Sequence, residues 1–366
     1  MNQTSLRRMA IALAAGLAAA GSVAPAAAAS RDSTTPADDG AGLDELLAAS
    51  ADENALIIYG NPSDNIWEPI LAAFGEAYPD IDVETFDLGG LEAFQRYLSE
   101  SASGVATADM IIASESVGWL DLVERGDVVD FLAPEAGNIP EFGTQAPGVY
   151  AMSVDPLVAM YNEMLIPADE QPTTLAGLAA LAPELDGGIG TVEIENSQAY
   201  TATFGFVTAG GEEAWATLEA LGPHTSAESG TGALLDKATS GEYAASFFVS
   251  GAIRPLLDNE AQGEVLDYRY LEDATPLVPR GMGIVADADS PASARLFVNW
   301  ILSADGQTAL CAGGLTPYRD DVECPYGYQA IAELIGEDNM ILVNYDAALE
   351  TERDTIVSRW NELFGR

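Results

Sequence analysis

The sequence predicts an α/β protein of two lobes, each a doubly wound, mostly parallel sheet flanked by helices. Apolar runs typical of buried strands alternate with amphipathic helical patterns from residue 55 onward. A second such series follows a Pro- and Gly-rich passage at residues 130–147. The chain has 366 residues, of which 48% are hydrophobic, so it is long enough to form two cores.

The first series has the order strand, helix, strand, helix, strand, helix. We expect strands at residues 55–60, 81–90 and 108–114, and helices at 63–80, 91–102 and 117–125. In the first of these helices, Ile66, Ile70, Phe74 and Tyr78 recur at helical spacing. This βαβαβα order predicts one doubly wound sheet.

The second series begins after two extended segments at residues 148–165, which we expect to be broken at Asp155-Pro156. Helices are then expected at 175–185, 199–211, 212–222 and 232–241, and strands at 187–194 and 242–250. A strand at 281–288, a helix at 291–311 and a last helix at about 351–363 follow. The expected domains are lobe 1 at 51–150 with a return segment at 277–330, lobe 2 at 151–276, and C-terminal helices at 331–366 that pack on lobe 2.

The first 29 residues have the pattern of a secretory signal peptide. Arg7 and Arg8 precede an apolar stretch, and an Ala-rich end near Ala29 predicts the cleavage site. Because no cysteine lies near that site, we expect no lipid anchor, and no later run predicts membrane insertion. Residues 30–50 read as a flexible leader with a short helix. These features predict a periplasmic protein.

The net charge is −44, from 58 acidic residues against 14 basic ones, and Lys237 is the single lysine. Such a charge excludes nucleic acid and anionic membranes as natural partners. The acidic residues are spread along the chain, which is typical of a strongly hydrated surface suited to a saline habitat. Capture of a cation would need specific ligands in addition.

The two cysteines, Cys311 and Cys324, are expected to form a disulfide. A pair of cysteines in an exported chain favours a disulfide over a metal site, and the C-x-x-C spacing of redox proteins is absent.

Small polar residues follow each predicted strand of the first series. The carboxyl ends of parallel strands meet at one edge of a sheet, where open α/β folds hold their ligands. For Ser114 and Ser116 the alternative is a helix N-cap. The candidate binding residues at this edge are Asn61, Ser63, Asp64, Gly89, Gly90, Ser114, Glu115 and Ser116.

The second series supplies further candidates at Asn196, Ser197, Gln198, Ser250, Gly251 and Arg254. Glycines allow backbone N–H groups to approach a ligand, and helix N-termini favour anionic groups. Arg254 could pair bidentately with a carboxylate or phosphonate, and the alternative is a surface salt bridge to an acid such as Asp258. Arg280 is a candidate for the same kind of pairing with a ligand anion. Trp67 and Tyr59 are expected in the core rather than at a ligand.

The sequence gives little support for an enzyme. No nucleophile elbow, zinc-protease motif, P-loop or dinucleotide fingerprint is present. His224, the single histidine, stands in the loop "GPHTS" without metal-ligand spacing. The one enzyme hypothesis left is a small-molecule hydrolase that uses the carboxyl groups of Asp64 and Glu115. Because the known catalytic motifs are missing, we expect a binding protein instead.

Several motifs between residues 54 and 325 carry a family resemblance. They are "LIIYG", "IWEPILAAFGEAYPDIDVE", "ADMIIASE", "VAMYN", "DKATSGEYAA" and "GIVADADSPASARLFVNWILSADGQTAL…GGLTPYRDDV". In these the chain resembles the type II solute-binding proteins of bacterial ABC importers, nearest to the ferric-iron-binding subgroup. The resemblance implies a monomeric clamshell without a resident cofactor, which closes on a small solute and delivers it to an ABC permease and its ATPase. A sensor subunit that presents its ligand to a membrane receptor would use the same clamshell.

The resemblance also implies a metal role for Glu115, which stands where the family has a glutamate after the third strand. The counterpart of the family's histidine lies near Ser63. The adjacent tyrosine pair is missing, because residues 250–253 read Ser-Gly-Ala-Ile. Fe³⁺ favours anionic oxygen ligands, so this set would hold it weakly unless Tyr200 or Tyr243 took part. We therefore expect the ligand to be iron(III), an iron chelate or a small anionic organic compound.

Overall fold

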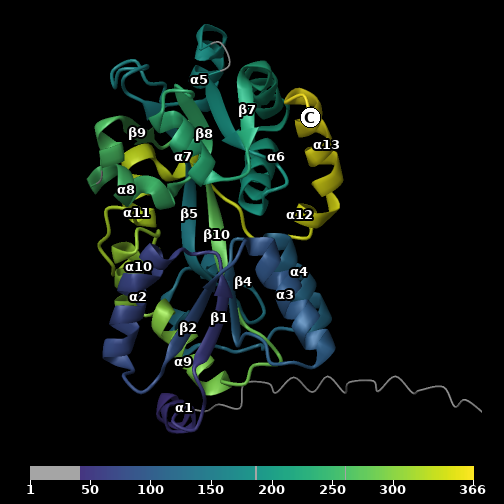
Figure 1. Cartoon of the computed structure of the whole chain (residues 1–366), viewed down its shortest axis with the longest axis vertical. Helices are drawn as coiled ribbons and strands as arrows, with labels where there is room; N and C mark the ends of the chain where they lie inside the picture. The colour runs from purple at the N-terminus through teal and green to yellow at the C-terminus, as the bar shows by residue number, and fades with distance from the viewer. Residues whose placement is uncertain (1–41, 186–187, 260) are drawn as a thin grey trace, which may run out of the picture. The chain divides into compact units, whose positions relative to one another are not determined.

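The computed structural model describes residues 42–185, 188–259 and 261–366. The chain divides into two units, Met1–Thr34 and Thr35–Arg366, and all described residues belong to the second. The predicted signal peptide and residues 30–41 of the predicted leader lie outside the described residues. The second unit is a mixed α/β structure, as predicted, and its elements are labelled in Figure 1.

The strands of this unit form one hydrogen-bonded sheet in the order β2-β1-β3-β10-β5-β8-β6-β7. The triplets β2-β1-β3 and β8-β6-β7 are parallel, whereas β10 and β5 between them run antiparallel to their neighbours. β11 pairs with β10, and β4 and β9 pair with β5. The strands are β1 Leu56–Gly60, β2 Val83–Asp87, β3 Met110–Ala113, β4 Thr144–Ala146, β5 Val149–Asn162, β6 Ile189–Val192, β7 Thr225–Glu228, β8 Ala245–Ser250, β9 Leu266–Arg269, β10 Thr275–Ile284 and β11 Met340–Leu342.

Helices cover both faces of each triplet, which is the doubly wound arrangement that the sequence predicts. Apolar residues of α2, α9 and α10 pack with β1 and β3 on one face, and those of α3 and α4 pack on the other. Around the second triplet, α5, α6 and α13 share one core cluster, and α7, α8 and α11 share another. The helices are α1 Leu43–Ser50, α2 Asp64–Ala77, α3 Gly90–Ser103, α4 Ser116–Arg125, α5 Leu175–Leu181, α6 Ser197–Leu221, α7 Thr231–Thr239, α8 Arg254–Asn259, α9 Pro291–Leu302, α10 Ala304–Ala312, α11 Tyr328–Ile335, α12 Ala348–Thr351 and α13 Arg353–Leu363.

The break expected at Asp155-Pro156 is wrong, because β5 continues through it. Pro156 lacks an N–H and is usually confined to strand edges. Here it stands opposite Leu277 of β10, and the pairing of β5 with β8 begins one residue later, at Leu157. Pro156 thus lies at the point where the pairing of β5 changes from β10 to β8.

Two helical predictions differ in their breaks. The single helix expected at 291–311 is two helices, because Ser303 is extended and its hydroxyl accepts a hydrogen bond from the Gly306 N–H. The predicted division between residues 211 and 212 is confirmed, since Gly211 has φ 55° inside α6. A positive φ of this kind favours glycine.

The described part of the expected flexible leader is helix α1. It packs against α9, and Leu46 is buried in the core that α2 and α9 share. Residues 43–50 are therefore a packed element, in contrast to the expected flexible segment.

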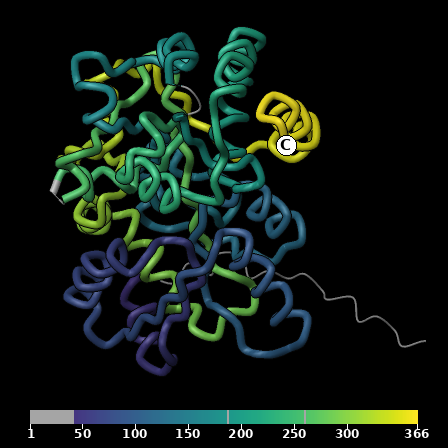
Figure 2. Tube along the Cα trace, turned by 45° about the horizontal axis from the view of Figure 1, so that its top comes forward, coloured from purple at the N-terminus to yellow at the C-terminus, as the bar shows by residue number. Residues whose placement is uncertain are grey.

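The C-terminal segment contacts both parts of the sheet. After β11, the Tyr345 hydroxyl donates to the Pro279 carbonyl and accepts from the Gly281 N–H. Farther on, α13 packs on α6, and the two lie side by side in Figures 1 and 2. Trp360 of α13 is buried in the same core cluster as α6.

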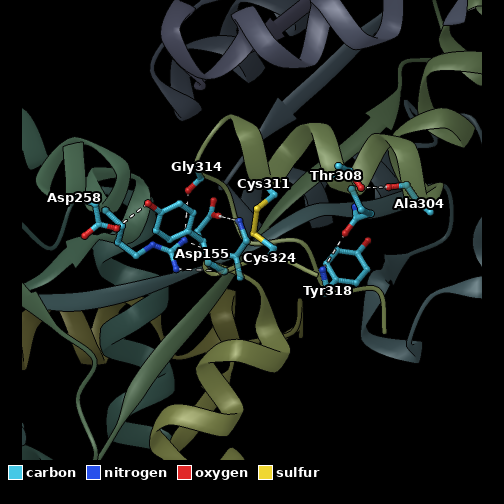
Figure 3. Close-up of a disulfide and its surroundings, with 12 residues drawn as sticks. Asp155, Asp258, Ala304, Thr308, Cys311, Gly314, Tyr318 and Cys324 are labelled. Carbon is cyan, nitrogen blue, oxygen red and sulfur yellow. Dashed lines mark hydrogen bonds between the residues drawn. A yellow bond between two sulfur atoms is a disulfide. The ribbon is translucent and has the colours of Figure 1, made fainter. Parts of the chain in front are cut away.

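The predicted disulfide is confirmed. Cys311 at the end of α10 is bonded to Cys324, with an S–S distance of 1.98 Å (Figure 3). The bond closes a short segment that contains Gly314 and Tyr318. The Tyr318 N–H donates to Gln307 of α10, so the closed segment is also held by hydrogen bonds.

Candidate functional site

A polar cavity of about 250 Å³ lies where three helices begin. Its walls come from Asn61 after β1, from the start of α3, from the β3–α4 junction, and from the start of α6. The lining residues are Asn61, Gly89, Gly90, Leu91, Glu92, Ser114, Glu115, Glu195, Asn196, Ser197 and Gln198. Candidates from both halves of the sequence therefore meet in one cavity.

The sheet topology explains the first wall. β1 and β3 are parallel neighbours, with Gly60 opposite Ile112, so their carboxyl ends lie at one edge. The Asn61 N–H donates to the Ile112 carbonyl at 3.2 Å, which holds the residue after β1 beside the end of β3. This is the strand-end position where open α/β sheets bind ligands.

The N-cap alternative for Ser114 and Ser116 is wrong. Glu115 occupies the N-cap position of α4, and its side chain does not cap the helix. Ser116 is buried, and its hydroxyl forms a 3.1 Å hydrogen bond with that of Thr201 in α6. The Ser114 side chain is 3% exposed, and its hydroxyl has no hydrogen-bond partner within the described ranges. A buried hydroxyl without a partner costs free energy, so Ser114, which lines the cavity, stays a candidate for a ligand contact.

Glu115 is an acid held in a poorly solvated position. Its side chain is 6% exposed. Burial raises the pKa of its carboxyl, against the opposite effects of the Ser197 hydroxyl, the Arg353 guanidinium and the Gly118 N–H. A Cβ on Gly118 would lie 2.9 Å from Cγ of Glu115, so the glycine is needed for this side-chain position.

The second wall is the start of α6. The Asn196 side chain caps this helix by accepting hydrogen bonds from the N–H groups of Gln198 and Ala199, at 3.0 and 3.3 Å. Ser197 follows, and its hydroxyl lowers the pKa of the Glu115 carboxyl, against the effect of burial. The Asn196 cap therefore orients the start of α6 at the cavity.

Arg254 is not at the cavity. It is 0% exposed, and each of its five N–H groups has an acceptor. Because all five donors are engaged, neither expectation for Arg254 applies: it has no donor left for a ligand, and the structure shows no salt bridge to Asp258. The acceptors are the carbonyls of Gly251, Tyr326 and Gly314 and the hydroxyls of Tyr270 and Thr316.

The remaining candidates also lie outside the cavity lining. The Ser63 hydroxyl bonds to Asn65 at 2.6 Å, and Asp64 is exposed at the start of α2. Asp64 therefore does not line the cavity with Glu115, as the hydrolase hypothesis requires. Ser250 accepts a hydrogen bond from Ala252, and a Cβ on Gly251 would lie 2.7 Å from the Pro156 ring. Among the lining residues, Leu91, Glu92 and Glu195 were missed, although Leu91 and Glu195 each adjoin a predicted residue and Glu92 lies two positions after Gly90.

The tyrosines considered as replacement iron ligands are engaged elsewhere. The Tyr200 hydroxyl donates to the Leu349 carbonyl, and burial raises its pKa to about 12. The Tyr243 hydroxyl donates to Glu228, and burial raises its pKa as well. Within residues 42–185, 188–259 and 261–366, no group of three or more His, Cys, Asp and Glu is placed to hold a metal ion.

The fold and the cavity at its strand ends define a solute-binding protein of the type II periplasmic class. The model of the bacterial extracellular solute-binding protein family matches residues 70–334, and the chain belongs to that family. A curated relative is a probable ABC transporter periplasmic-binding protein, y4fP, from Sinorhizobium fredii, which is 24% identical over 276 residues, 73% of this chain and 75% of the relative.

Two solved structures show the same fold. Iron-bound HitA from Pseudomonas aeruginosa has a TM-score of 0.69 and 20% identity, over 84% of this chain and 99% of that one. AfuA from Actinobacillus pleuropneumoniae, with exogenous fructose-6-phosphate bound, has a TM-score of 0.69 and 19% identity, over 85% and 98%. The predicted resemblance, including its ferric-binding neighbours, is confirmed.

This family consists of transport proteins, which confirms the prediction that the chain is not an enzyme. The protein is therefore an extracellular solute-binding protein of this bacterial family, and its relative y4fP is named as a probable periplasmic-binding protein of an ABC transporter. In the part of the chain that the structure describes, no helix combines the length and apolar character needed to cross a membrane.

Proposed function

We propose that this protein captures a small anionic organic solute that carries hydroxyl groups, and delivers it to the permease of an ABC importer. The observation that carries the proposal is the meeting of the α3 and α6 starts around the buried Ser114 and Glu115. The proposed binding residues are the predicted candidates that line the cavity: Asn61, Gly89, Gly90, Ser114, Glu115, Asn196, Ser197 and Gln198. The lobes proposed to close on the solute are residues 51–150 with 277–330, and residues 151–276.

The anionic part of the solute is inferred from the helix starts. The first N–H groups of a helix lack partners within it and carry partial positive charge, so they bind phosphate or carboxylate oxygens. Two helices of at least three turns, α3 and α6, begin at the cavity. The Asn196 side chain already accepts from two of the first N–H groups of α6, so we assign the anion to the start of α3, at Gly89-Gly90. These glycines leave the backbone open to a ligand. The N–H groups at this helix start would be the positive partners of an anionic group in a cavity that Glu92, Glu115 and Glu195 also line.

The hydroxyl part of the solute is inferred from Ser114 and Glu115. The Glu115 carboxyl accepts hydrogen bonds, and the Ser114 hydroxyl both donates and accepts. A cavity of about 250 Å³ lies just below the range of drug-sized ligand sites, roughly 300–1,000 Å³, and so fits a small solute. A sugar phosphate or a hydroxy acid has both kinds of group at this size. The fructose-6-phosphate bound to AfuA is one such compound.

Bare ferric ion is the less favoured ligand. Glu92 and Glu195 line the cavity with Glu115, but among the described residues no group of three or more His, Cys, Asp and Glu is placed to hold a metal ion. Tyr200 and Tyr243 are committed to other acceptors. A hard trivalent cation would then have neither the tyrosine pair nor a cluster of carboxylates placed to hold it, which is a poor match to its preference for several anionic oxygen ligands.

The test is a ligand assay on the exported protein. Native mass spectrometry identifies what co-purifies, and the protein is then unfolded, dialysed and refolded. Thermal unfolding is measured with fructose 6-phosphate, citrate, inorganic phosphate and Fe³⁺. We expect a hydroxylated organic anion to raise Tm, since a ligand at about 100 times its Kd stabilises the folded state by about 2.7 kcal/mol.

Glu115→Ala should abolish this rise in Tm. The matched control is Ser63→Ala, because Ser63 lies nearby at the start of α2 but does not line the cavity. A response to Fe³⁺ alone that persists in Glu115→Ala would contradict the proposal.

A further inference from the structure

Arg280 reaches the cavity without lining it. It lies within β10, is 4% exposed, and pairs with the buried Asp155 of β5 through Nε at 3.2 Å and Nη2 at 2.9 Å. Its Nη1 donates to Oδ1 of Asn61, which does line the cavity. The guanidinium thus connects the central strand pair to the ligand site.

This contact fixes which end of the Asn61 amide faces the cavity. A guanidinium has only donors, so the atom that faces Arg280 must be the carbonyl oxygen of the amide. The NH₂ group of Asn61 then points away from Arg280. The orientation follows from hydrogen-bond chemistry and does not depend on telling nitrogen from oxygen.

The freed NH₂ group faces the same space as Glu115. The Cβ position of Gly90, which lines the cavity, is 3.9 Å from Nδ2 of Asn61 and 3.8 Å from Oε2 of Glu115. A donor and an acceptor are therefore presented side by side. A solute group at that point would meet both.

Asp155 holds the guanidinium in place. Its Oδ2 accepts from the Ser153 hydroxyl at 3.0 Å and its Oδ1 from the Thr316 N–H at 3.3 Å, in addition to Arg280. Because the Asp155 carboxylate is held from several sides, the guanidinium that pairs with it is also fixed in position. From this fixed position Arg280 binds the Asn61 amide.

We propose that Arg280, anchored by Asp155, is a positioning residue that holds the Asn61 amide with its NH₂ group as a fixed hydrogen-bond donor in the cavity. The effect on ligand binding rests on the proposed function: the fixed donor would select solutes that have a hydrogen-bond acceptor next to the group that binds Glu115. The positioning itself is a property of the protein without ligand.

The first readout therefore needs no ligand. In ¹⁵N-labelled protein, the side-chain NH₂ of Asn61 is assigned by its loss in Asn61→Asp, and its order parameter is measured. In Arg280→Met we expect it to fall below about 0.6, the range of flexible groups. The matched control is Arg254→Met, another buried arginine without contact to the cavity, and its Asn61 order parameter should equal that of the wild type.

A buried Asp155 without its partner could prevent folding of Arg280→Met. The double variant Asp155→Asn with Arg280→Met removes both charges together and serves as the second test, since replacing a whole buried pair is often tolerated. Its Asn61 order parameter should fall as in Arg280→Met. An Asn61 amide as ordered in these variants as in the wild type would overturn the proposal, as would an equal loss in Arg254→Met.

The second readout is binding of fructose 6-phosphate and citrate by calorimetry. For whichever probe the wild type binds, we expect about tenfold weaker affinity in Arg280→Met, partial rescue in Arg280→Lys, and no change in Arg254→Met. Unchanged affinity would overturn the selective role of the donor. If the wild type bound neither probe, the proposed ligand class would fail, and the order parameter would still decide the positioning role.

Discussion

Arg254 and Arg280 are both buried arginines, yet they serve different parts of the molecule. Arg254 has five neutral acceptors, three of them carbonyls, and holds the segment closed by the disulfide. Arg280 has one carboxylate and one amide, and the amide belongs to the cavity. The difference shows that burial of a cation does not define its role, whereas the atoms that accept its hydrogen bonds do.

The largest effect is expected at the anchor of Arg280. Asp155→Ala leaves a buried guanidinium without its carboxylate, so the free energy of unfolding should fall by about 3–5 kcal/mol. Urea denaturation of the purified variant measures it. A loss below about 1 kcal/mol would mean that Arg280 finds another partner.

Removal of the other arginine should affect stability alone. Arg254→Met leaves three carbonyls without their shared donor, and we expect a loss of about 3 kcal/mol in the free energy of unfolding. The same denaturation measures it. The ligand-induced rise in Tm should stay as in the wild type, and its disappearance would contradict the separation of the two arginines.

The disulfide should support the Arg254 region in the same way. Its cysteines are 13 residues apart, and on the chain-entropy model a loop of that size contributes about 3 kcal/mol. We expect a comparable or slightly smaller loss for Cys311→Ser with Cys324→Ser. The rate of amide hydrogen exchange should rise around Gly314 and not at Asn61. An equal rise at both would contradict the prediction that the disulfide stabilises the Arg254 region alone.

Glu115 should give the cavity a pH signature that neither arginine has. Burial raises the pKa of its carboxyl above that in the unfolded chain. The folded state then binds the proton more readily, so the contribution of Glu115 to stability is present at acid pH and is lost as the pH rises through the folded pKa. Glu115→Gln should therefore gain stability relative to the wild type as the pH rises from about 4, the ordinary pKa of a glutamate. Urea unfolding over this rise in pH checks it, and parallel curves would contradict it.

The smallest effect on stability is expected at Gly90. A methyl group there would lie 3.7 Å from Cβ of Glu115, an ordinary contact, so Gly90→Ala should change the free energy of unfolding by less than about 0.5 kcal/mol. The same methyl fills the space between Asn61 and Glu115. Weaker binding of the wild-type ligand at unchanged Tm is the expected result, measured by calorimetry, and unchanged binding would place the solute elsewhere in the cavity.

Most of the fold could be predicted because its central strands β3, β5, β8 and β10 are buried on both faces. Runs such as Met110–Ala113 are apolar throughout, and the helices between them have clear amphipathic spacing. The failures have local causes. Pro156 indicated a break because a sequence does not show that its strand changes neighbours there, and Ser303 divided a helix by capping the next one.

The cavity was predicted where strand order alone determines it. Glu115 and Asn61 follow parallel neighbours, so their meeting follows from topology. The role of Arg254 could not be predicted, because its acceptors come from segments as far as Tyr326. The contact of Arg280 with Asn61 joins residues that are 219 positions apart, and no local pattern reports it.

The hydroxyl of Tyr345 has a consequence for the order in which the chain is made. It occupies both the Pro279 carbonyl and the Gly281 N–H, on either side of Arg280 in β10. A nascent chain that has not yet reached residue 345 leaves these two groups unsatisfied. Residue 345 must therefore be synthesised before the Pro279 carbonyl and the Gly281 N–H acquire these two bonds, and a chain that stops short of Tyr345 never acquires them.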